Sequence, residues 1–89
     1  MNKRKNRILY SIVPNGQGTT LNLSVDSRNV KSLKNFYEIF EKKYGKEIEG
    51  ELTHSSSHSN LKIFLEEGLE KSKEIFYPFI DSLKKDINL

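Results

Sequence analysis

Four cationic side chains fall within five positions near the start of the chain, at Lys3, Arg4, Lys5 and Arg7. Cations at this density can neutralise the phosphates of a nucleic acid and release its bound counterions, which provides affinity independent of base sequence. The sequence therefore predicts a flexible basic arm over residues 1–7 that lies along a nucleic acid.

A second group of cations, Arg28, Lys31 and Lys34, opens the helix expected in the first half of the chain. These side chains would extend the basic surface of the arm, and the start of a helix also offers unpaired amide groups to phosphate. Arginine, which reads guanine in bidentate fashion, is scarce. The leading prediction is a small non-enzymatic protein that contacts the phosphates of DNA or RNA.

An alternative surface is the open face of the expected sheet. It would carry Asn22, Ser24, Glu49, Glu51, Lys62 and Phe64. One aromatic among carboxylates suits a protein partner better than RNA, whose bases stack on several aromatics. The alternative function is a regulator, adaptor or inhibitor that docks on a host or nucleic-acid-handling complex, with Phe64 as an anchor.

Two histidines and a glycine-rich turn are the remaining candidates for a metal, phosphate-binding or catalytic site. His54 and His58 lie in a serine-rich connection that either only joins two strands or also contacts a partner or phosphate, and both belong to the alternative protein-binding surface. A metal site is not expected, because no cysteine and no third nearby ligand apart from Glu51 is present. The segment 15–18 lacks the lysine and hydroxyl of a phosphate-binding loop and reads as a hairpin turn. A Ser/His pair in the connection has no orienting carboxylate, so no catalytic, metal or cofactor site is expected.

The elements of the first half are defined by two hydrophobic periods. Residues 8–13 are β-branched and aromatic, and residues 20–26 alternate with Leu21, Leu23 and Val25 on one face, which predicts a hairpin. Residues 30–44 carry an apolar stripe at three- and four-residue spacing, which predicts a helix ended by Gly45. Ser27 or Asn29 is expected to cap this helix.

The second half repeats the order. Residues 47–53 alternate with Ile48, Gly50 and Leu52 inward, and residues 61–66 alternate again, although they could instead begin a helix. A final helix is expected from Leu69 to about Ile87. Because Pro78 removes a helical hydrogen bond, a kink or a break into two helices is predicted near Tyr77.

Together these elements predict an α+β domain over residues 8–89, with the order ββαββα. Its four-stranded antiparallel sheet would carry both helices on one face, because every apolar stripe needs the same core. Similar motifs recur in the two halves at offsets of 38 residues for the strands and 40 for the aromatic helix segments. The order resembles that of the SUI1-type translation-initiation fold. That family's Gly-Asp-His loop corresponds here to Glu67-Gly68-Leu69, so the resemblance carries over no functional residue.

The charge is divided between the two halves. Residues 1–46 hold ten Lys and Arg against three Asp and Glu, whereas residues 47–89 hold five against nine, which gives +7 and −4.

The chain contains no alanine, and its lysine-rich composition indicates an AT-rich coding sequence, as in a low-GC bacterium, its phages or other mobile elements. Without a signal peptide or a long apolar segment, a cytoplasmic protein is expected. A homodimer joined through edge strands is a further possibility.

Overall fold

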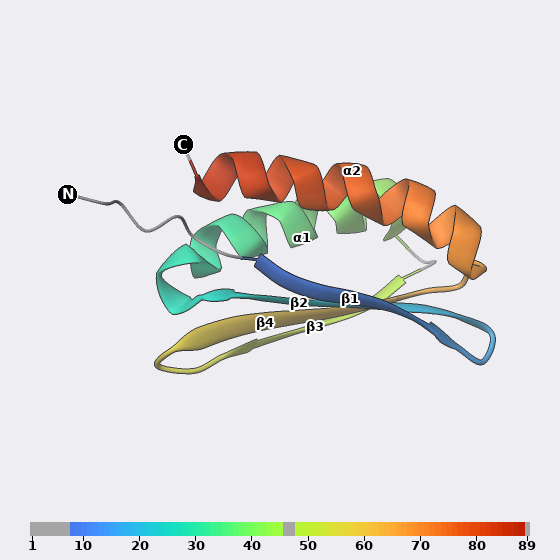
Figure 1. Cartoon of the computed structure of the whole chain (residues 1–89), viewed down its shortest axis with the longest axis horizontal. Coiled ribbons are helices and arrows are strands. Elements are labelled where there is room, and N and C mark those ends of the chain that lie inside the picture. The colour runs from blue at the N-terminus through green and yellow to red at the C-terminus, as the bar shows by residue number, and fades with distance from the viewer. Residues whose placement is uncertain (1–7, 46–47, 89) are drawn as a thin grey trace.

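The computed structural model describes residues 8–45 and 48–88, which form an α+β fold. A four-stranded antiparallel sheet, in the order β1-β2-β4-β3, carries two helices on one face (Figure 1). The elements are β1 (Ile8–Asn15), β2 (Gly18–Asp26), a 3₁₀ turn (Ser27–Asn29), α1 (Val30–Tyr44), β3 (Ile48–His54), β4 (His58–Leu65) and α2 (Leu69–Ile87). The predicted strands and helices are therefore confirmed, including a strand rather than a helix over residues 61–65.

The core lies between the sheet and the helices. Strands β2 and β4 are central and contribute alternate buried residues, as half-buried strands should. The buried apolar side chains are Leu21, Leu23, Val25, Leu33, Phe40, Leu61, Ile63, Leu65, Phe76, Ile80, Leu83 and Ile87. The apolar stripe of each helix and the inner face of the sheet thus share a single core.

Each helix reaches the edge strand of the other hairpin. α1 follows the β1–β2 hairpin but extends across to β3, where the Tyr37 ring packs directly on Gly50. α2 follows the β3–β4 hairpin and lies over β1 and β2, where Tyr77 meets the edge of the Tyr10 ring at 6.4 Å. The two hairpin–helix units are therefore interlocked rather than stacked side by side.

Pro78 does not divide the last helix, so the predicted break into two helices is wrong. α2 is one helix of 19 residues with Pro78 inside it. Pro78 and Glu74, whose carbonyl would otherwise accept its missing N–H, are both exposed, so water can satisfy that carbonyl. Phe76 and Ile80, on either side of the proline, are both buried and hold the helix against the sheet.

The helix caps also differ from the prediction. Asp26 accepts a hydrogen bond from the backbone N–H of Arg28 at 3.0 Å and so caps the 3₁₀ turn that precedes α1. Asn29, at the N-cap of α1, makes no side-chain cap bond, and its buried Nδ2 has no hydrogen-bond partner.

Within the described residues, neither helix combines the length and hydropathy that a membrane span would need.

Candidate nucleic-acid interface

The sheet brings the point where the basic arm is attached next to the start of α1. Ile8, the first described residue, pairs with Val25, and Arg28 follows three residues after Val25. The predicted arm residues Lys3, Arg4, Lys5 and Arg7 lie outside the described residues. Their attachment point nevertheless lies beside the junction between β2 and α1, where the second predicted group of cations begins.

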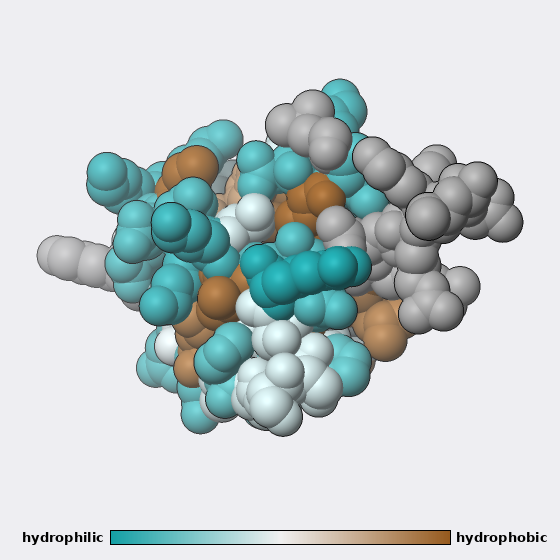
Figure 2. Space-filling view, turned by 90° about the vertical axis from the view of Figure 1, so that its left-hand side faces the viewer, coloured by the Kyte–Doolittle hydropathy of each residue, from teal (hydrophilic) through white to brown (hydrophobic). Residues whose placement is uncertain are grey.

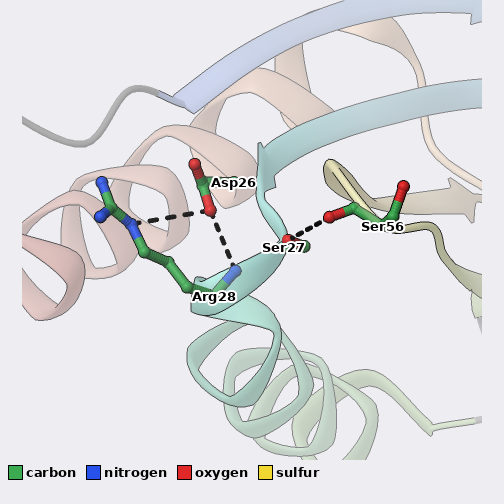
Figure 3. Close-up of polar contacts among 4 residues, drawn as sticks. All are labelled: Asp26, Ser27, Arg28 and Ser56. Carbon is green, nitrogen blue, oxygen red and sulfur yellow. Dashed lines mark hydrogen bonds and ion pairs between the residues drawn. The ribbon is translucent and has the colours of Figure 1, made fainter.

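Arg28 is held at this junction by its neighbour Asp26 (Figure 3). Its Nε lies 3.6 Å from Asp26 Oδ1, and both side chains are largely exposed, at 65% and 48%. An exposed pair of this kind contributes about 0–1 kcal/mol, so a phosphate can compete for the guanidinium group.

Ser27 ties the same junction to the opposite hairpin (Figure 3). Its backbone N–H donates to Ser57 O at 3.1 Å, and its hydroxyl donates to Ser56 O at 3.0 Å. The serine-rich turn is therefore a support for the start of α1. Ser27 serves as this tie rather than as the predicted helix cap.

Lys31 and Lys34 project from the first turns of α1. Both are exposed, and a spacing of three residues places them on one side of the helix. The first turn of α1 holds no acidic residue. The structure thus places the three predicted cations in one continuous segment, with Lys31 and Lys34 open to solvent.

The end of α2 adds cations that sequence reasoning missed. Phe36 contacts Phe79 and Phe40 contacts Phe76, with ring centroids 5.6 and 5.7 Å apart, so the helices run antiparallel. The last turn of α2, which carries Lys84 and Lys85, consequently lies at the same end as the start of α1 (Figure 1).

Lys84 also lies close to β1, with its Nζ 5.5 Å from the centroid of the Tyr10 ring. The only sequence signal for these two lysines was their position in the last turn of a helix, which has an ordinary explanation in the helix dipole. The antiparallel helix pairing, which the sequence did not reveal, is what brings them to this end.

Figure 2 looks onto this end of the molecule and shows hydrophilic side chains over much of it, with hydrophobic patches between them. The basic end is defined by Arg28, Lys31, Lys34, Lys84 and Lys85. Asp26 and the exposed Asp86 are acidic residues at the same end. The basic end retains an excess of positive charge before the arm is counted.

The open sheet face carries the residues of the alternative prediction. The pairing of the strands aligns Glu51 with Lys62 and Asn22, and Glu49 with Phe64 and Thr20. A hollow of about 480 Å³ lies between the first of these rows and the neighbouring row of Ser24, Asn60 and Thr53, and it is lined in part by Asn22, Ser24, Glu51 and Lys62. The strand register therefore brings the expected polar residues together on this face.

Strand β1 adds two apolar residues to that face that the sequence did not assign to it. Leu9 and Val13 are 63% and 45% exposed, whereas Ile8 and Ile12 pack against the core on the other side. Because both faces of β1 carry apolar side chains, the alternation of polar and apolar residues did not show which face turns toward the core.

Phe64 is less available than an anchor should be. Its ring lies over Gly18, where an added Cβ would approach Phe64 Cζ to 2.6 Å, and the side chain is half-buried. Phe64 therefore packs within the sheet face rather than projecting from it.

The two histidines do not form one site. His54 ends β3 and His58 begins β4, and alternation points them to opposite faces of the sheet. His54 Nδ1 lies 2.7 Å from Ser59 Oγ, and His58 Nδ1 lies 3.0 Å from Ser57 Oγ. Each histidine supports the hairpin locally.

Comparison with known proteins adds no relative: no family model, no curated protein and no solved structure matches this chain.

Proposed function

We propose that this protein is a small non-enzymatic nucleic-acid-binding protein that contacts phosphates through its arm and its basic end. The observation that supports this proposal is the position of three segments in the fold. The attachment point of residues 1–7, the start of α1 and the last turn of α2 lie at one end of the fold, although they are far apart in the sequence.

The charge distribution gives the complex an orientation. Glu49 and Glu51 lie on β3, at the far edge of the sheet from β1, the strand to which the arm is attached. A polyanion is attracted to the basic end and repelled by the acidic strand, so the acidic strand would face away from it. Because the phosphate contacts do not depend on base identity, binding should show little sequence preference.

Deleting residues 2–7 tests the proposal. Binding to a fluorescein-labelled duplex and to a single-stranded RNA of equal length is measured by anisotropy at several salt concentrations. Every phosphate contact that the deletion removes should lower the slope of log affinity against log salt by about 0.9 on duplex DNA and about 0.7 on a single strand. We expect the deletion to lower the slope by a few units and to weaken binding most at low salt.

Charge-neutralising variants provide the matched controls. Lys31→Gln with Lys34→Gln should weaken binding on every sequence tested, because these lysines contact phosphate, whereas Lys62→Gln on the open sheet face should leave it unchanged. Equal effects of the two changes, or an unchanged salt slope after deletion of the arm, would contradict the proposal. If the intact protein binds no nucleic acid, the hollow on the open sheet face, which Glu51 and Lys62 line in part, becomes the leading candidate for a docking surface.

A further inference from the structure

A groove runs between α1 and α2 on the outer side of the helix layer, away from the sheet. It has a volume of about 230 Å³ and is lined by Phe36, Ile39 and Lys43 from α1 and by Ile75, Pro78 and Phe79 from α2, among others. The groove is therefore mainly apolar and is built from both helices.

The floor of the groove is rigid and its edges are open to solvent. Phe36 and Phe79 meet edge to face with centroids 5.6 Å apart, and Phe79 also packs on the buried Phe40 at 4.9 Å. Ile39 on one edge is 59% exposed, and Pro78 on the other edge is also exposed. An exposed aliphatic side chain beside a preformed aromatic floor is typical of a docking groove.

The charges along the groove are mainly positive. Lys43 lines it, with its Nζ 5.7 Å from the Tyr44 ring. Lys42 lies three residues after Ile39, and Lys71 lies four residues before Ile75, so both share a helix face with residues that line the groove. Glu74, one turn before Pro78, and Asp81, three residues after it, carry the opposing charges, and Lys43 is the charged residue that lines the groove itself.

Pro78 contributes a further feature. It has no N–H, so the carbonyl of Glu74 lacks the hydrogen bond that a helix would normally supply. Both residues are exposed and Pro78 lines the groove, so this acceptor can receive a hydrogen bond from a polar side chain of a bound partner.

We propose that the groove between the helices binds an acidic amphipathic helix of another protein. Apolar side chains at positions i, i+3, i+4 and i+7 of that helix would insert between Ile39 and Pro78. Its carboxylates would pair with Lys42, Lys43 and Lys71. These lysines lie near the end of α1 and the start of α2, away from the basic end, so nucleic acid and this partner can bind at the same time.

The test uses displayed random peptides of about 16 residues, a length that can form a helix. Peptides are selected on the full chain and then counter-selected against the Ile39→Glu variant. We expect enrichment of sequences with helically spaced apolar residues and Asp or Glu between them. Synthetic copies should bind the Ile39→Glu variant at least about tenfold more weakly, because a carboxylate would enter the apolar site, and the Lys43→Glu variant several-fold more weakly.

Leu9→Glu is the matched control, because Leu9 is an aliphatic residue of similar exposure, at 63%, on the open sheet face. It should leave peptide binding unchanged, and thermal unfolding should show that all three variants remain folded. No enrichment, enrichment of basic peptides, or equal loss in the Leu9 and Ile39 variants would overturn the proposal. A dimeric mass in light scattering that Ile39→Glu returns to the monomer would also overturn it, because a second copy would then fill the groove.

Discussion

Tyr37 is the residue at which the first helix meets the edge of the sheet. Its ring packs against Gly50 on β3, so that a side chain at position 50 would overlap the ring. Burial, the nearby charge of Glu41 and a hydrogen bond to Glu41 together raise the pKa of the Tyr37 phenol above its usual value of 10.0. Both features lead to predictions that concern single side chains.

Gly50→Ala should destabilise the fold by about 1–3 kcal/mol, because the added methyl group forces the Tyr37 ring to move. Urea denaturation gives the free energy of unfolding, and a Tyr37→Ala background provides the control. If the clash is the cause, the cost of Gly50→Ala should fall to a small fraction in that background. The same cost in both backgrounds would mean that β3 itself rejects a side chain at position 50.

Ionisation of Tyr37 should destabilise the protein in alkali. Because the folded-state pKa lies above the unfolded value of 10.0, the neutral phenol's contribution is fully present below pH 10 and is lost as the pH rises through the folded pKa. Tyr37→Phe should therefore make the free energy of unfolding fall less steeply above pH 10. Glu41→Gln, which removes the charge beside the phenol, should change the profile in the same direction, and a pH profile that is unchanged in both variants would contradict this assignment.

At the scale of elements, α2 shows how packing can override a local signal. Sequence reasoning weighed the proline alone and predicted a kink or a break into two helices, but a helix breaks only where nothing holds both parts in line. Phe76 and Ile80 anchor the two sides of Pro78 in one core, and the lost hydrogen bond faces solvent. The cost of the missing hydrogen bond remains, although the helix is continuous.

Replacing Pro78 with alanine should recover part of this cost. The missing N–H returns and the clash with the preceding turn is relieved, so the melting temperature should rise, with a gain of about 1–3 kcal/mol. Calorimetry measures the change, and Ser82→Ala, an exposed replacement one turn later, gives the gain due to alanine's helix propensity alone. A lower melting temperature for Pro78→Ala would contradict this prediction and show that the proline stabilises the fold.

At the scale of the whole molecule, the sequence predicted the four strands, the two helices and most inward-facing residues, because two clear periods separate strands from helices, but it did not predict the 3₁₀ turn Ser27–Asn29. It predicted neither the place of Lys84 and Lys85 at the basic end nor the groove at Ile39 and Pro78. Both depend on the antiparallel pairing of the helices, which arises from ring contacts between residues about 40 positions apart. Cations that are close together in the sequence could be recognised from the sequence, whereas cations from distant segments that folding brings together could not.

The crossing of the helices bears on how such a chain could have arisen. In the strand order β1-β2-β4-β3, each hairpin places its first strand at an edge of the sheet and its second strand in the middle. There Leu23 of β2 faces Leu61 of β4. Tyr37 and Tyr77, 40 positions apart, each reach the edge strand of the other unit, at Gly50 and Tyr10. A single strand–strand–helix unit would have its helix directed away from its own edge strand and would leave much of its apolar face uncovered. If the chain arose by duplication, an ancestor of half this length would have needed a second copy whose helix covered its strands, and joining the two copies would have turned an intermolecular core into an intramolecular one.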